Sequence, residues 1–284
     1  MGVRGRRRHW VWAVVAGVSV VLVLAGYLTV RFIRSTASDE CTARGTDGTT
    51  ATLDPDQASH AATIAAVAHA RGLPERAVTI ALATAIQESK LRNLTYGDRD
   101  SLGLFQQRPS QGWGTSAQIL DPVHAAGTFF DALVKVPDYL GLPVTVAAQR
   151  VQHSGYPQAY ARHEGMAATL AGALSGREGP ALTCTVGDTA TTKATDDVAA
   201  AVEREFGGTP APRTTPDGGL TYWIPAGRTS TGWSLALWLV CHATELHITS
   251  VTFDGRRWSS ADSGQGWTHT APDAGDTRTL TVTR

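Results

Sequence analysis

The residues best suited to acid–base chemistry are a glutamate at the end of a predicted helix and two aspartates in the loop that follows. Glu88 is preceded by a helical face of small side chains that includes Ala77, Ala81 and Ala85. A carboxyl group at the mouth of such an apolar face is partly desolvated, which favours its protonated form. That form can give a proton to a leaving group. On position alone, a general acid and a solvated glutamate in the last helical turn are equally good interpretations.

Two short motifs change the balance between these interpretations. Glu88-Ser89 ends the helix, and Gly-Leu-Phe-Gln at residues 103–106 lies in the loop that would face it. In this order the motifs resemble the soluble lytic transglycosylase and goose-type lysozyme superfamily. The hallmark of that superfamily is a Glu-Ser pair at a helix end with a Gly-Leu-x-Gln motif in the facing loop. The resemblance covers residues 63–174.

The resemblance implies a mainly helical, lysozyme-like domain that cuts the glycan strand of peptidoglycan. Glu88 would protonate the glycosidic oxygen between N-acetylmuramic acid and N-acetylglucosamine. Ser89 would help to place the substrate, and Gln106 would hydrogen-bond the sugar near the scissile bond. In a lytic transglycosylase the same carboxylate then takes a proton from the muramic C6 hydroxyl, and the product is an anhydro sugar formed without water.

Aromatic residues near these motifs are candidates for substrate contact. Where the family usually has an Ala-Tyr-Asn-x-Gly element, this chain has Val-Gln-His-Ser-Gly-Tyr-Pro at residues 151–157. Tyr156 or Tyr160 would orient Glu88 or line the cleft; the alternative is a core residue with a bonded hydroxyl. Trp113, in a Gly-Trp-Gly loop, could stack on a sugar or anchor the core.

The reaction type depends on a second carboxylate. An inverting hydrolase needs one about 6.5 to 9.5 Å from the acid to activate water. Asp98 and Asp100 are the candidates, but an aspartate beside glycine in a turn usually hydrogen-bonds its own backbone. We therefore favour a lytic transglycosylase. A hydrolysing muramidase that uses an additional Asp is the alternative.

The N-terminus predicts a membrane anchor. Four arginines precede residues 10–30, which carry no charge. That run is long enough for a bilayer, whose core needs roughly 20 helical residues. Because the denser arginine cluster lies before the span, we expect a single-pass protein of the cell membrane with its body outside the cytoplasm. A cleaved signal peptide with its site at residues 35–37 is the alternative.

Cysteine usage agrees with export, since an oxidising compartment permits disulfides. Cys41 and Cys184 lie in polar segments on either side of the central region, whereas Cys241 lies in an apolar run. We predict a disulfide between Cys41 and Cys184 and a buried free thiol at Cys241. Two free thiols at the first pair of positions are the alternative.

Composition and periodicity predict an α+β protein of several parts. A tail and transmembrane anchor occupy residues 1–33, and a linker rich in Thr, Ser, Gly and Asp occupies residues 34–56. A mainly α-helical domain spans 57–185, a second linker spans 186–196, and a small α+β domain spans 197–284. Helices are expected at residues 58–71, 74–88, 122–134, 144–152, 158–174, 198–206 and 233–246, and strands at 220–224, 250–258 and 280–282.

The C-terminal part faintly resembles a domain related to D-Ala-D-Ala metallopeptidases. Those relatives bind zinc with an upstream His and Asp and a late His-x-x-His-x-His segment. Here residues 276–282 read Asp-Thr-Arg-Thr-Leu-Thr-Val, and His242, His247 and His269 are scattered. We expect no metal and no cofactor, and predict a degenerate, non-catalytic module that binds wall or a partner, or is a structural appendage.

The charge balance limits the partners. The chain has 25 Lys and Arg and 25 Asp and Glu residues, and a net charge near zero argues against nucleic acid. Peptidoglycan and the membrane are the expected partners. A rival hypothesis from another class is a non-catalytic wall-binding scaffold of a secretion or conjugation machinery.

Overall fold

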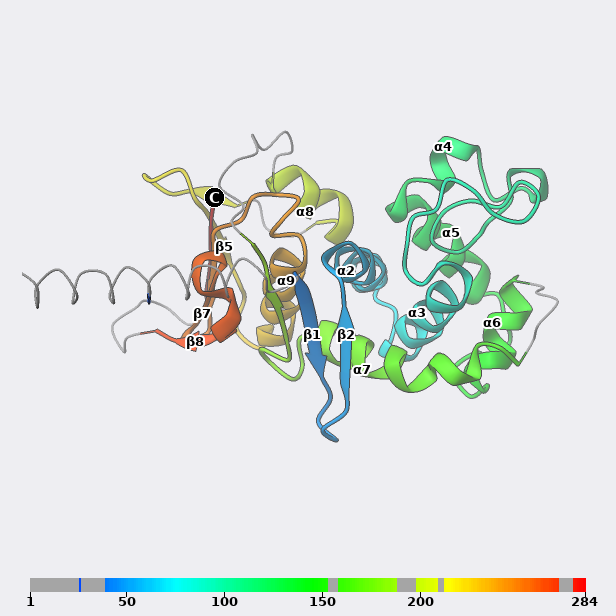
Figure 1. Cartoon of the computed structure of the whole chain (residues 1–284), viewed down its shortest axis with the longest axis horizontal. Helices are drawn as coiled ribbons and strands as arrows, with labels where there is room; N and C mark the ends of the chain where they lie inside the picture. Colours follow the sequence, from blue (N-terminus) through cyan, green and yellow to red (C-terminus); the bar gives the residue numbers. More distant parts are fainter. Residues whose placement is uncertain (1–25, 27–38, 153–157, 188–197, 209–211, 271–277) are drawn as a thin grey trace, which may run out of the picture. The chain divides into compact units, whose positions relative to one another are not determined.

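A computed structural model describes residues 26, 39–152, 158–187, 198–208, 212–270 and 278–284. Residues 39–284 form one compact unit, separate from residues 1–38. The compact unit is α+β, with helices and two antiparallel sheets (Figure 1). Except for Gly26, residues 10–30, where we predict the anchor, lie outside the described residues. No helix within the described part has the length and apolar character needed to cross a bilayer.

The first sheet corrects the prediction of a linker over residues 34–56. Strands β1 (Glu40–Arg44) and β2 (Thr50–Leu53) pair with each other, and β1 also pairs with β3 (Leu182–Thr185). Cys41, Ala43, Ala51 and Leu53 alternate with more exposed residues and are buried. The alternation could not be recognised from the sequence, because the side chains are small and the partner strand is far away, with Cys41 and Cys184 separated by 143 positions.

The predicted disulfide is confirmed. Cys41 and Cys184 face each other directly in the β1–β3 pair and are bonded. Cys241 is free and buried, as expected. The disulfide therefore joins the start of the compact unit to the strand that follows the helical region.

Helix α2 (Pro55–Ala70) runs through the middle of the unit (Figure 1). It begins three residues earlier than predicted because Asp54 and Gln57 form a capping box, in which each side chain accepts a hydrogen bond from the other residue's backbone N–H. Its sides contact α5 (Pro122–Leu133), α8 (Val198–Phe206) and α9 (Thr229–Cys241).

Helix α3 (Glu75–Ser89) carries the candidate acid at its end. Ala77, Ala81 and Ala85 are fully buried, and such small side chains let helices approach closely. Helix α3 packs mainly against α7 (Glu164–Leu174) and α6 (Val144–Gln152). The predicted helix over residues 158–174 is split, since a 3₁₀ turn, η2 (Ala161–His163), precedes α7. The short elements η1 (Pro109–Gln111) and α4 (Ser116–Ile119) follow the irregular loop.

The second sheet has the strand order β4-β5-β9-β6-β7-β8. The predicted single strand over residues 250–258 is a hairpin instead. Its turn is Asp254-Gly255, where both residues have positive φ, as the favoured two-residue hairpin turns require. The strands are β4 (Arg213–Thr214), β5 (Leu220–Trp223), β6 (Ser250–Phe253), β7 (Arg256–Ser259), β8 (Thr268–His269) and β9 (Thr279–Thr283), and η3 (Ser260–Gln265) follows β7.

The two regions predicted as separate domains pack directly on each other. Ser234 in α9 donates a hydrogen bond to the carbonyl oxygen of Leu174, and the Trp258 indole donates one to the carbonyl oxygen of Cys184. Helix α9 also contacts α2 and β3. The predicted linker over residues 186–196 lies almost entirely outside the described residues. The predicted boundary is therefore crossed by buried contacts within one compact unit.

A buried polar cluster lies where α2, α8 and α9 meet. Glu205 is 5% exposed and accepts a hydrogen bond from the Trp238 indole at 2.6 Å. His242 stacks on Trp238, and its Nε2 lies 4.0 Å from Glu205 Oε1 and 3.4 Å from the Thr63 hydroxyl. Burial raises the pKa of Glu205 to about 7 and lowers the pKa of His242 to about 4. Both groups are therefore mainly neutral near pH 6.

These shifts predict opposing effects of pH on stability. Glu205 costs stability as pH rises from 4.5, the ordinary value, to about 7, whereas His242 adds stability between about 4 and 6.5. Glu205→Gln removes only the first effect and can still accept from Trp238. The free energy of unfolding of Glu205→Gln minus that of wild type should therefore increase by up to about 3 kcal/mol between pH 4.5 and 8.

Urea unfolding of residues 39–284 at several pH values measures this difference. Glu203→Gln is the matched control, because Glu203 lies on the same helix but is exposed. The control should show no growth with pH. A Glu205→Gln difference that stays constant across this range would contradict the assigned protonation.

Candidate functional site

The centre of the candidate site is a hydrogen bond between Glu88 and Tyr160. Glu88 is half-buried in the last turn of α3, and Tyr160, just before η2, is fully buried. The Tyr160 hydroxyl donates to Glu88 Oε1 at 2.6 Å. Among the described residues, Glu88 Oε2 has no hydrogen-bond partner. One carboxyl oxygen is thus fixed and the other is left for a ligand. Tyr156, the other candidate, lies outside the described residues.

The Gly-Leu-Phe-Gln motif forms a tight loop that is held against the core. An antiparallel bridge between Leu102 and Gln107 closes it. Leu104 and Phe105 are fully buried, and Phe105 stacks on Phe129 with ring centroids 4.6 Å apart. These two apolar side chains anchor the loop and leave the next residue to point elsewhere.

Gln106 has a positive φ of 48° and a half-buried side chain. Its amide nitrogen is 3.3 Å from the carbonyl oxygens of Tyr96 and Gly103, both weak hydrogen bonds. A Cβ on Gly97 would overlap the Gln106 side-chain oxygen. Gly97 therefore makes room for this carboxamide in its observed position.

Ser89 supports the loop rather than reaching outward. It is 5% exposed, and its hydroxyl lies 2.7 Å from the carbonyl oxygen of Leu104 and 3.0 Å from that of Ala85. From the other side, the Gln152 amide at the end of α6 donates to the carbonyl oxygen of Phe105 at 2.7 Å. Ser89 thus bonds to backbone on both sides, so any effect on a ligand, as the resemblance implies, would act through the loop.

The two aspartates have different surroundings. Asp100 Oδ1 accepts from Arg108 Nε at 2.6 Å and Oδ2 from the Ser110 backbone N–H at 2.8 Å. The Arg108 guanidinium and Ser110 hold the pKa of Asp100 well below its ordinary 3.8. Asp100 is thus a structural anion with both oxygens occupied. The Asp98 side chain is 92% exposed, with Arg99 Nε at 4.0 Å.

Trp113 is half-buried and packs against the core. His124 Nε2 lies 3.4 Å from its carbonyl oxygen, which fixes the loop to α5. The aromatic side chain most exposed near the loop is Tyr96, at 71%. Sequence reasoning did not single out Tyr96, because an exposed tyrosine in an irregular loop has no distinguishing pattern.

Three further polar residues fix the end of α3. Gln87 Oε1 accepts from Arg162 at 2.8 Å and lies 3.0 Å from His163 Nε2. Partial burial, and then the nearby Arg162 guanidinium, lower the pKa of His163. Arg162 Nε also donates to His163 Nε2 at 3.2 Å, so the three side chains form one cluster. Sequence reasoning missed this contact between Gln87 and Arg162, because the two residues are 75 positions apart in the chain.

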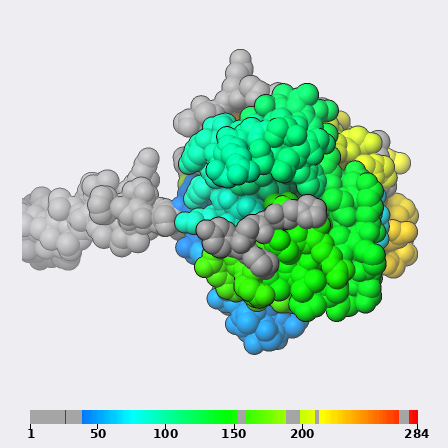
Figure 2. Space-filling model, turned by 90° about the vertical axis from the view of Figure 1, so that its right-hand side faces the viewer, coloured from blue at the N-terminus to red at the C-terminus, as the bar shows by residue number. Residues whose placement is uncertain are grey.

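Figure 2 shows the face formed by the loop and by the helices around α6. A separate hollow of about 580 Å³ lies on the second sheet. Its lining contains no carboxyl group, although His269 lies on it, and Glu88 is the carboxyl group that a buried hydroxyl holds in place. We therefore locate the candidate acid site at Glu88. Within the described residues, no three His, Cys, Asp or Glu side chains group as a metal site would require.

Comparison with known proteins adds no assignment. No protein-family model matches this chain, and no curated protein matches its sequence.

Proposed function

We propose that this protein cleaves the glycan strand of peptidoglycan between N-acetylmuramic acid and N-acetylglucosamine, as a lytic transglycosylase with Glu88 as its catalytic acid. The observation that carries the proposal is the 2.6 Å hydrogen bond from the buried Tyr160 to Glu88, beside the loop that presents Gln106. A fixed carboxyl group next to a polar loop is what proton transfer to a bound polymer requires.

In the proposed reaction the free Glu88 Oε2 carries the proton. The proton passes to the glycosidic oxygen as the bond from that oxygen to muramic C1 breaks. The leaving sugar thereby gains a hydroxyl. The Glu88 carboxylate, stabilised by the Tyr160 hydrogen bond, then takes the proton of the muramic C6 hydroxyl. O6 bonds to C1, giving a 1,6-anhydro end and restoring the acid. No water is consumed.

The surroundings of the aspartates favour this route over inverting hydrolysis. An inverting enzyme needs a carboxylate free to take a proton from water. Both Asp100 oxygens are already hydrogen-bonded, and Asp98 is nearly fully exposed. A muramidase that uses Asp98 stays as the alternative.

We also propose that the compact unit works outside the cytoplasm, tethered by residues 10–30. The Cys41–Cys184 disulfide supports this, because disulfides persist mainly in oxidising compartments. A wall-binding scaffold of a secretion or conjugation assembly is the rival function, and it requires no catalysis by Glu88.

Glu88→Gln removes the transferable proton and should lower the rate of wall cleavage at least about 100-fold. Tyr160→Phe keeps the ring but removes the hydrogen bond, and should cost roughly tenfold. Release of soluble fragments from purified peptidoglycan measures both. Arg44→Ala, on the exposed surface of β1, is the control. Equal release by wild type and Glu88→Gln would refute the assignment of Glu88.

Mass spectrometry of the products distinguishes the two reactions. We expect anhydro-muramic ends from wild type, from Asp98→Asn and from Asp100→Asn. Asp100→Asn should also lower the melting temperature, because it breaks the pair with Arg108. If wild type instead gave reducing ends, and Asp98→Asn gave none, the enzyme would be a hydrolase rather than a transglycosylase.

A double-mutant cycle tests whether Gly97 sets the position of the Gln106 side chain. Gly97→Ala should displace the Gln106 carboxamide and slow cleavage about tenfold, and Gln106→Ala should have a similar effect. Because both act on one contact, the double variant should be little worse than either single variant. Gly127→Ala, which meets nothing within 4 Å, is the control. Fully additive losses would show that Gly97 acts otherwise.

A further inference from the structure

The register of the second sheet aligns six side chains in one row across its outer face. Each neighbouring pair is directly opposite in the ladder, and directly opposite residues share a face. We call this set the threonine row. Its members, in strand order, are Arg213, Thr221, Thr281, Thr252, Arg257 and Thr268.

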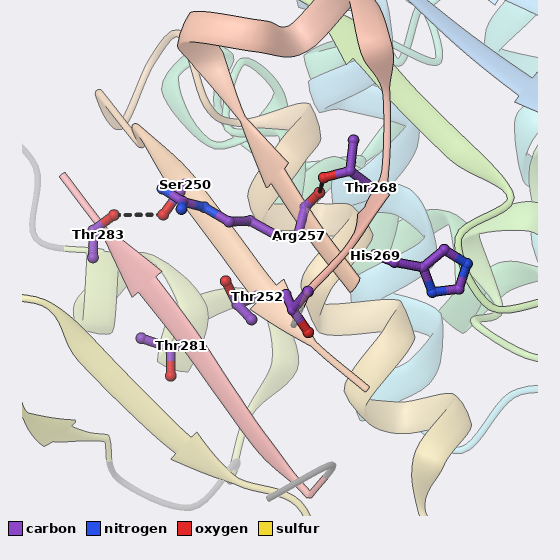
Figure 3. A pocket seen from close by; sticks show the side chains of 8 residues that line it. Ser250, Thr252, Arg257, Thr268, His269, Thr281 and Thr283 are labelled. Atoms are coloured by element: carbon purple, nitrogen blue, oxygen red, sulfur yellow. Dashed lines mark hydrogen bonds between the residues drawn. The ribbon is translucent and has the colours of Figure 1, made fainter. Parts of the chain in front are cut away.

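Among the described residues this face carries a hollow, whereas the other face is buried. Val251, Phe253, Leu280 and Val282, which alternate with the row, are at most 1% exposed, and α9 packs against their strands. On the outer face the described residues line the hollow of about 580 Å³ (Figure 3). Its lining includes Ser250, Thr252, Arg257, Thr281 and Thr283.

Most members of the row offer hydrogen-bonding groups that have no partner among the described residues. Within the described ranges, the hydroxyls of Thr221, Thr252 and Thr281 make no hydrogen bond, and neither Arg213 nor Arg257 has an ion pair. Arg213 and Arg257 are exposed, and no carboxyl group lines the hollow. Guanidinium groups favour carboxylates and phosphates. The face therefore suits a hydroxyl-rich ligand that carries negative charge.

The spacing indicates an extended polymer rather than a small molecule. Neighbouring strands are about 4.8 Å apart, so the four strand steps from Arg213 to Arg257 span roughly 19 Å. An extended β-linked glycan advances by a similar distance per sugar, which would set one sugar over each strand. Trp223, two residues from Thr221 on the same face, is 52% exposed, and the Arg278 guanidinium lies over its ring, 5.7 Å from the centroid.

We propose that the threonine row is a second glycan site, which binds a β-linked strand with carboxylates on its sugars. Its arginines would bind carboxylates on sugars that lie well apart along the strand, and the threonines the hydroxyl and amide groups between them. Resting on the proposed function, this ligand is the stretch of wall glycan outside the cleavage site. The second sheet then holds the polymer while the Glu88 site cuts it.

Calorimetric titration of the full chain in detergent tests the proposal. Glu88→Gln is used throughout so that the ligand stays intact. The probe is an octasaccharide of alternating N-acetylglucosamine and N-acetylmuramic acid without peptide stems. We expect two sites per chain, and one after Arg213→Ala/Arg257→Ala. Thr252→Val/Thr281→Val should weaken the same site about tenfold, and a neutral N-acetylglucosamine octamer should bind it more weakly.

The matched control is Arg44→Ala/Arg228→Ala, which removes two exposed arginines away from the row. Superimposable isotherms for the two double-arginine variants would overturn the proposal, as would equal binding of the neutral octamer to the row.

The outcome is separable from that of the proposed function. With Glu88 intact, cleavage of a short soluble tetrasaccharide should be unchanged in Arg213→Ala/Arg257→Ala. If the Glu88 site is not a glycan site, the parent chain binds one octasaccharide and the double variant none. The second site is then retained while the proposed function fails.

Discussion

The candidate site depends on how two buried carbonyl groups are satisfied. Burying Leu104 and Phe105 removes their backbone oxygens from water, and an unpaired buried carbonyl is costly. Ser89 at the end of α3 donates to the first, and Gln152 at the end of α6 donates to the second. The loop is thereby tied to the ends of α3 and α6. The position of Gln106 follows from these ties, since it is the next residue in the same tight turn.

Local patterns predicted the helical part of this framework well. Apolar periodicity and the helix breakers gave α3, α5, α6 and α8 to within a residue or two. Burial of the free Cys241 followed from its apolar neighbours, and the disulfide followed from export and the positions of the other cysteines. Each of these features depends on residues close together in the chain or on compartment chemistry.

Features that depend on residues far apart in the chain could not be predicted from the sequence. Strands β1 and β2 exist because β3, which follows α7, completes their sheet. Their small residues, such as Ala43 and Ala51, carry little alternation without it. The choice between Tyr156 and Tyr160 could not be made from spacing, because Tyr160 reaches Glu88 across 72 positions. The hydrogen bonds made by Ser89 and by Asp100 likewise form only when the loop is folded.

Contacts across the predicted domain boundary have a consequence for function. Thr63 of the helical region lies beside His242 and Glu205 of the C-terminal region, in a cluster that excludes water. A buried polar cluster is stable only when its members keep their partners. The two regions are therefore held in one arrangement, and a polymer bound to the second sheet would have a defined direction relative to Glu88.

The overall charge conceals how charge is distributed over this unit. Equal numbers of acidic and basic residues argued against a polyanionic partner, yet net charge says little about any one face. In the loop that follows Glu88, Asp100 is paired with Arg108. On the outer sheet Arg213 and Arg257 end a run of three threonines, with no carboxylate between them. A neutral chain can thus carry a local preference for an acidic glycan, because two cations at matched spacing act on the ligand without a large global field.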